Sequence, residues 1–65
     1  MKQVTCITNE YFENIKELQV DGKYYMDTES IFIGTTGESS AVFYTQDHVK
    51  LGMLPLKLFT TVYDN

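Results

Sequence analysis

The sequence predicts an all-β chain folded as a small barrel of about five strands, and three observations support this. Short β-favouring runs recur along the chain between turn signals. Aromatic residues make up 14% of the composition, and aromatic side chains favour strands. The single proline, Pro55, lies in the apolar octet 52–59, where it must end a strand because it cannot donate to a sheet ladder.

Each expected element follows from the residue types in its run. The expected strands are the runs 2–8, 23–33, 41–45, 50–54 and 60–63. Residues 56–59 are too few for a packed α-helix and fit one 3₁₀ turn before the last strand, which places Leu58 and Phe59 on the core. Closure of the sheet into a barrel is expected to remove exposed strand edges.

Turn signals separate these strands. The pair Asp21-Gly22 predicts a turn in which glycine accepts a positive φ. Residues 27–29 interrupt the run 23–33, so either this strand bulges or two strands meet in a tight connection. Residues 34–40 contain two glycines and no large apolar side chain, and are expected to form a loop, while residues 46–48 form a short turn.

Residues 9–19 leave two alternatives open. Three apolar residues fall at the helical spacing i, i+4 and i+7, namely Tyr11, Ile15 and Leu18. With Thr8 as an N-cap, this pattern predicts a short helix and an α+β fold. A helix of this length is marginal by itself and Asn14 is a poor helix former, so a long irregular loop is the equal alternative.

Length, charge and cysteine content restrict the class of protein. The 65 residues accommodate one domain, residues 1–65, which buries only about 60% of its unfolded surface. A net charge of −4, with lysine as the only basic residue type apart from one histidine, disfavours nucleic-acid binding. Cys6 is the only cysteine, so no internal disulfide forms, and no leader or long apolar run is seen. We expect a cytoplasmic protein without a membrane segment.

Catalytic and metal-binding patterns are weak in this chain. His48 beside Asp47 resembles an oriented general base, but a solvated turn residue is the favoured explanation of the pair. Cys6 alternates with Val4 on the first expected strand, so we expect a buried thiol and not a nucleophile. One Cys and one His give no metal-ligand spacing. We therefore expect a protein that is not an enzyme, with no catalytic residue, metal or cofactor.

The candidate binding residues lie in an acidic segment. Residues 10–29 carry six carboxylates against two lysines. Solubility alone explains such an excess of charge. The functional interpretation is a protein-docking surface that has Tyr11 and Phe12 as aromatic anchors and Glu10, Glu13 and Glu17 as an acidic rim, which attracts a basic partner.

Two further possibilities remain. The first is a small nucleic-acid-binding barrel that uses exposed tyrosines and the five lysines, which are Lys2, Lys16, Lys23, Lys50 and Lys57. The second is a homo-oligomer, because three Met, five Tyr and four Phe exceed what one small core hides and leave an apolar patch.

Two segments of the chain resemble SH3 domains. One is the run Leu18-Gln19-Val20-Asp21-Gly22-Lys23-Tyr24-Tyr25, in which an apolar residue leads through a glycine turn into the second strand. The other is the octet 52–59, which is similar to the SH3 ending Gly-x-φ-Pro-x-x-φ-φ, where φ is apolar. In size, acidity and its Val-x-Cys-Ile start, the chain resembles the small SH3-like proteins encoded by bacteriophages and prophages. This resemblance implies an SH3-like barrel and an accessory protein that binds and modulates a host bacterial protein.

The chain departs from the SH3 pattern at the peptide groove. It has no Trp, and Leu58 stands where the SH3 ending places a groove tyrosine. Proline-rich peptides are held in aromatic-lined grooves. The resemblance therefore extends to the fold and not to the proline-rich ligand.

Overall fold

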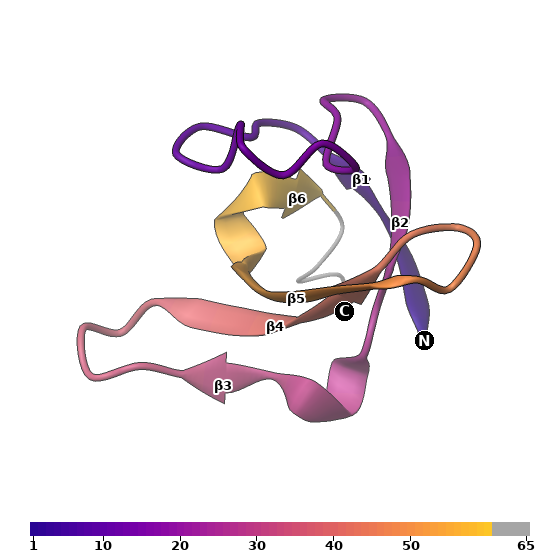
Figure 1. The fold of residues 1–65 in the computed structure, drawn as a ribbon. Helices are drawn as coiled ribbons and strands as arrows, with labels where there is room; N and C mark the ends of the chain where they lie inside the picture. Colours follow the sequence, from indigo (N-terminus) through magenta and orange to yellow (C-terminus); the bar gives the residue numbers. More distant parts are fainter. Residues whose placement is uncertain (61–65) are drawn as a thin grey trace.

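A computed structural model describes residues 1–60 and shows an all-β chain, as predicted from the sequence. Within these residues, six strands form one antiparallel sheet that curls into a half-barrel (Figure 1). The elements are β1 (Lys2–Cys6), β2 (Lys23–Met26), the 3₁₀ turn η1 (Thr28–Ser30), β3 (Phe32–Ile33), β4 (Ser39–Tyr44), β5 (Lys50–Pro55), the 3₁₀ turn η2 (Leu56–Leu58) and β6 (Phe59–Thr60). Residues 61–63 of the predicted last strand lie outside the described residues.

Strand β4 organises the sheet, because both of its edges are paired. One edge pairs with β5 along residues 40–44, and the other edge is shared by β2 and β3. β2 pairs in turn with β1, and β1 pairs with β6. Since η2 joins β5 to β6 through the chain, the two ends of the curled sheet meet at that corner (Figure 1).

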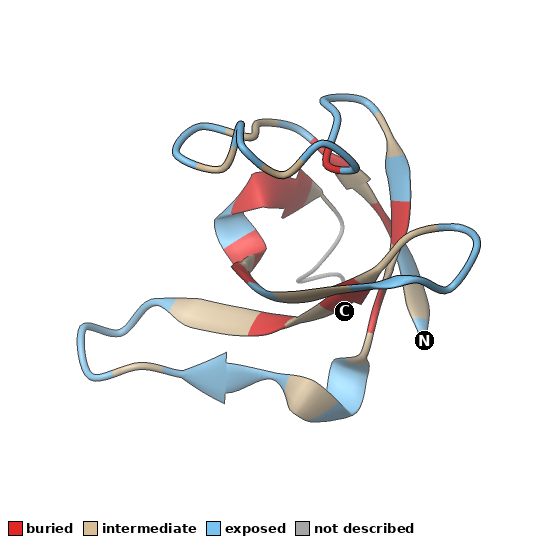
Figure 2. Cartoon of the chain, viewed as in Figure 1, coloured by how far each residue is buried: buried red, intermediate tan, exposed pale blue. Residues whose placement is uncertain are grey.

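The core is built from the inward side chains of the strands and of η2. Along β4, Ala41 and Phe43 are fully buried, while Val42 and Tyr44 on the other face are only partly covered, as strand alternation requires. The ring of Phe43 stacks on that of Phe59 with 4.0 Å between ring centroids. The buried residues are Val4, Cys6, Leu18, Tyr24, Met26, Ala41, Phe43, Leu54, Leu56, Leu58 and Phe59 (Figure 2).

The proline octet forms the corner that the sequence predicts. Pro55 is the last residue of β5, with φ −64° and ψ 140°, and η2 begins at the next residue. The 3₁₀ turn buries Leu56 and Leu58, and the chain then buries Phe59 at the start of β6. The fixed φ of proline and its missing N–H therefore end one strand and aim the chain at the core. Leu58, being buried, presents no side chain to a peptide groove.

Of the two alternatives for residues 27–29, the structure shows two strands joined by a tight connection. The Asp27 carboxylate accepts the Glu29 N–H at 3.0 Å and caps η1. The Ser30 hydroxyl donates to the Asp27 carbonyl at 2.7 Å and accepts the Val42 N–H at 2.8 Å. These bonds fasten the turn to β4, so β3 resumes along the same edge of β4 as β2.

The glycine-containing loop after β3 is shorter than predicted. The Gly34 N–H donates to the Glu38 carbonyl at 2.9 Å and closes a hairpin between β3 and β4. Ser39 and Ser40, predicted to lie in the loop, instead pair with β3, and Ser40 also pairs with Pro55 of β5. Backbone pairing on both sides outweighs the loop-forming composition of this segment. The hairpin projects away from the rest of the sheet (Figure 1).

Candidate functional site

The connection between β1 and β2 contains a series of tight turns, so the loop alternative for residues 9–19 is correct and the helix alternative is wrong. The N–H groups of Phe12, Ile15 and Leu18 donate to the carbonyls of the residues three positions earlier, at 2.8–3.1 Å. Each turn closes where the next begins, which gives a repeat of three residues in place of the helical 3.6. The Thr8 hydroxyl does accept the Glu10 N–H at 3.2 Å, but no helix follows it.

This three-residue repeat decides which side chains face the core. Phe12 and Ile15 are partly buried against the core, and Leu18 is fully buried. The helical spacing grouped Tyr11 with Ile15 and Leu18, but Tyr11 is 80% exposed. The sequence does contain the set Phe12, Ile15 and Leu18 at intervals of three. An interval of three is typical of tight 3₁₀-like turns but also occurs on one face of an α-helix, so the pattern alone does not separate the two alternatives.

The hydroxyl of Tyr24 fastens this loop to the barrel. It accepts the Gln19 N–H at 2.7 Å and donates to the Glu17 carbonyl at 2.6 Å. Gly22 makes room for it, because a Cβ at Gly22 would lie only 2.8 Å from the hydroxyl oxygen. The prediction of a positive φ at Gly22 is wrong, since Asp21 adopts the positive φ, at 71°. Glycine is required here for space and not for its conformation.

Tyr11 combines an exposed ring with an unfavourable backbone conformation. Its φ is 73°. It is the third residue of the turn that runs from Asn9 to Phe12, a position where a positive φ favours Gly or Asn. A left-handed conformation costs about 1–2 kcal/mol for an L-residue. Since the side chain is largely exposed, burial of the ring does not offset this strain.

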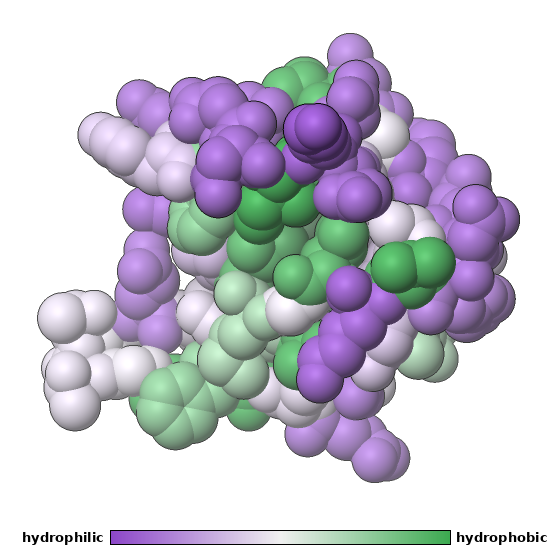
Figure 3. All heavy atoms as spheres, viewed as in Figure 1, coloured by the Kyte–Doolittle hydropathy of each residue, from purple (hydrophilic) through white to green (hydrophobic). Residues whose placement is uncertain are grey.

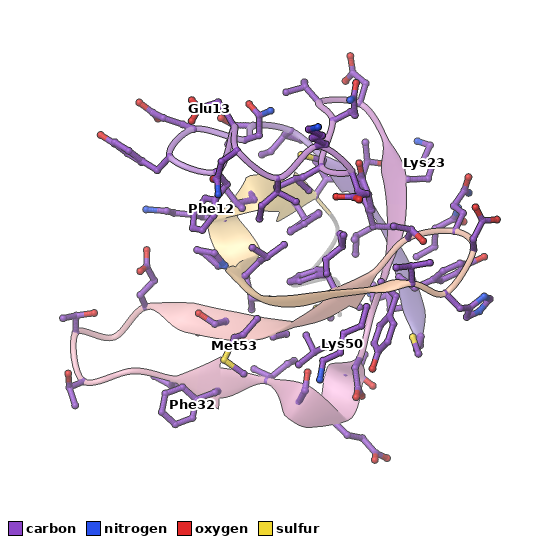
Figure 4. The ribbon with its side chains drawn as sticks, in the orientation of Figure 1. Phe12, Glu13, Lys23, Phe32, Lys50 and Met53 are labelled. Atoms are coloured by element: carbon purple, nitrogen blue, oxygen red, sulfur yellow. The ribbon has the colours of Figure 1, made fainter. Side chains whose placement is uncertain are left out.

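Three carboxylates share the solvent side of the loop with Tyr11. Glu10, Glu13 and Glu17 are all exposed and occupy the tips of successive turns. Four of the five candidate residues therefore lie together on the solvent side. Phe12 is the exception, because it lies between the loop and the barrel, below Glu13 (Figure 4).

Lys57 borders this acidic surface, and Lys16 is exposed within the loop itself. The Lys57 ammonium lies 3.0 Å from a Glu38 carboxylate oxygen. This contact raises the pKa of Lys57, and Glu10 and Tyr11 add smaller effects in the same direction.

Lys23 lies away from this surface, on β2, and donates to the Thr5 hydroxyl at 2.9 Å. The labelled lysines Lys23 and Lys50 are well separated in the view of Figure 4.

His48 and Cys6 lie in environments unlike those of a catalytic pair. His48 is the last residue of the turn closed by its own N–H and the Thr45 carbonyl, which confirms the short turn at 46–48. Its ring stacks on Tyr25, with 5.3 Å between centroids. Cys6 is fully buried and its thiol donates to the Thr8 carbonyl at 3.3 Å. Burial raises the pKa of the Cys6 thiol, which keeps it protonated at neutral pH.

We expect Cys6 to react with an aromatic disulfide reagent at least about 100-fold more slowly in the native protein than in the unfolded chain. The reason is that the thiol becomes accessible only when the core opens. Absorbance of the released thiolate measures the rate. In a Val49→Cys variant, the added thiol lies at an exposed position and should react at the unfolded rate. Equal rates for native and unfolded wild-type protein would contradict the expectation.

Within residues 1–60, the structure shows no pocket and no group of three or more His, Cys, Asp or Glu side chains arranged to hold a metal ion. In the same part of the chain, no helix has the length and apolar character to cross a bilayer. Comparisons with protein-family models, with curated proteins and with solved structures gave no match.

Proposed function

We propose that this protein is a non-enzymatic protein-interaction module whose docking surface is the loop 9–22. The observation that supports the proposal is Tyr11, a bulky residue at φ 73° with an 80% exposed ring. Backbone strain of this kind is found preferentially at functional sites. Tyrosine is also enriched among the residues that contribute most to binding energy at protein interfaces. Tyr11 is therefore the proposed central contact.

The proposed partner presents a basic surface. Glu10, Glu13 and Glu17 form an exposed acidic rim around Tyr11, and the whole chain carries a net charge of −4. Complementary charge raises the rate of association and excludes partners of the same sign. Phe12, which is partly buried against the core, supports the loop from below in this proposal.

The resemblance to phage-encoded SH3-like proteins suggests the setting. In this proposal the protein is an accessory protein in the host cytoplasm, and its partner is a bacterial protein that normally binds an anionic ligand. The acidic rim would occupy the basic site of that protein. A nucleic-acid-binding protein of the host fits this description, because its surface is basic.

Affinity capture from a bacterial lysate, followed by mass spectrometry and repeated after nuclease treatment, tests the proposal. The disrupting variant combines Tyr11→Ala, Glu13→Lys and Glu17→Lys. The matched control combines Val49→Ala, Glu29→Lys and Asp47→Lys, which change charge equally at other exposed positions.

We expect nuclease-resistant capture of a bacterial protein by the wild type and by the control. The disrupting variant should bind the captured protein roughly 30-fold or more weakly. Unchanged binding by the disrupting variant would refute the loop as the docking surface. Loss of every partner after nuclease treatment would instead favour the nucleic-acid-binding alternative.

Replacing Tyr11 alone with asparagine separates binding from stability. Asparagine accepts the left-handed conformation more readily than tyrosine, so the melting temperature of Tyr11→Asn should equal or exceed that of the wild type. Binding to the captured protein should weaken, because the ring is lost. Circular dichroism and a binding titration measure the two quantities. A clear fall in melting temperature would show that Tyr11 serves the fold and not recognition.

A further inference from the structure

We propose that the outer edge of β3 pairs with the same edge of a second copy of this chain, which gives a two-fold symmetric dimer. β3 pairs with β4 on one side, and among the described strands none pairs with its other side. Three consecutive apolar residues are exposed there: Ile31 at 45%, Phe32 at 60% and Ile33 at 67%. An apolar edge strand of this kind is a template for pairing with another chain.

The alternation of backbone groups determines the register of the dimer. The Gly34 N–H points toward β4, where it meets the Glu38 carbonyl. Phe32, two residues earlier, therefore points its backbone groups toward β4 as well, while those of Ile31 and Ile33 point outward. A two-fold axis at Phe32 sets Ile31 of each copy opposite Ile33 of the other. Each of these two pairs then exchanges N–H···O=C bonds in both directions.

Charge favours a second copy as the occupant of this edge. The net charge of −4 makes two chains repel each other over most of their surface, but residues 30–37 carry no charge. The pairing involves residues 31–33 of each copy, which are uncharged and are followed by the uncharged turn residues 34–37. Like charges opposite each other would be destabilising, and none occurs within this segment.

The shape of the molecule leaves this edge accessible. The β3–β4 hairpin projects from the barrel, on the opposite side of the molecule from the loop 9–22 (Figure 1). Met53 of β5, on the other side of β4, is also an exposed apolar residue, at 52%, and Figure 4 labels both Phe32 and Met53. Apolar side chains extend over the same face below the hydrophilic loop (Figure 3). Pairing through β3 thus joins the sheets of the two copies into one continuous sheet and leaves the proposed docking loops uncovered.

Sedimentation equilibrium of the full chain, from low micromolar to near-millimolar concentration, tests the dimer. We expect the mass of two chains at high concentration. Ile33→Lys places a charge in the pairing edge and should raise the dissociation constant at least about tenfold. Val49→Lys, at a position 55% exposed in the β4–β5 turn, is the matched control and should leave it unchanged. Circular dichroism confirms that each variant is folded.

Cross-linking tests the register. Phe32→Cys should form an interchain disulfide on mild oxidation, because residues opposite each other at a non-hydrogen-bonded antiparallel position have suitable Cα spacing. Val49→Cys, the control, should form no interchain disulfide. The native Cys6 is buried and therefore does not take part in cross-linking. A monomer at every concentration, or a dimer unaffected by Ile33→Lys, would overturn the proposal. If the chain is monomeric and its β3 edge binds a different protein, the proposal that a second copy of the chain pairs with this edge is overturned.

Discussion

Replacing Phe43 with alanine is expected to leave the protein largely unfolded at room temperature. Phe43 is fully buried at the centre of the core and stacks on Phe59 at 4.0 Å. Truncating a buried phenylalanine costs about 3–5 kcal/mol. A domain of this size has a total free energy of unfolding of only about 3–5 kcal/mol. The loss is therefore comparable to the whole stability of the fold.

Circular dichroism and urea titration measure this effect. Val42→Ala, one residue earlier on β4 but facing away from the core, is the matched control. It should lower the free energy of unfolding by less than about 1 kcal/mol, the range of strand propensities. A Phe43→Ala protein that unfolds cooperatively with nearly wild-type stability would show that the core is organised around other residues.

Replacing Tyr24 with phenylalanine is expected to lower the free energy of unfolding by about 1–3 kcal/mol and to loosen the loop 9–22. The substitution keeps the ring, which packs edge-on against Phe59 at 5.9 Å. It removes the hydroxyl, so the Gln19 N–H and the Glu17 carbonyl lose their partner. An unsatisfied backbone group costs about 1–3 kcal/mol when water does not reach it.

Amide hydrogen exchange resolves the local part of this effect. The Gln19 amide should exchange faster in Tyr24→Phe, while the amides of β4 keep their order of protection. Gly22→Ala should act similarly, because its Cβ would press on the same hydroxyl. Tyr25→Phe, at the next and partly exposed position, is the control and should change stability by less than about 0.5 kcal/mol. Unchanged exchange at Gln19 would contradict the anchoring role of Tyr24.

The parts of the fold that the sequence predicts are those where one local rule acts alone. The β-favouring run 41–45 predicts a strand, and β4 covers residues 41–44 of it. Pro55 ends β5 because its ring prevents further pairing. Neither conclusion depends on distant parts of the chain, so both are confirmed in the structure.

Other features depend on contacts between distant residues and could not be predicted in the same way. Gly22 is needed because the Tyr24 hydroxyl occupies the space beside it, which becomes visible only when β2 and the loop are placed together. The strained φ of Tyr11 likewise results from a turn whose ends are fixed by inward-facing neighbours. Of the candidate site, the acidic residues were predictable as exposed groups. The exposure of Tyr11 was predictable only under the loop alternative, because the helical spacing groups it with Ile15 and Leu18. The inward placement of Phe12 was not predictable.

The series of three-residue turns makes the loop a natural scaffold for diversification. One position in three, at Phe12, Ile15 and Leu18, contacts the core, and the residues between them face solvent. Substitutions at the outward positions leave the packed side chains unchanged, so a new binding specificity can be selected at nearly constant stability. A library that varies only residues 10, 11, 13, 14, 16 and 17 would explore recognition while the barrel keeps its fold.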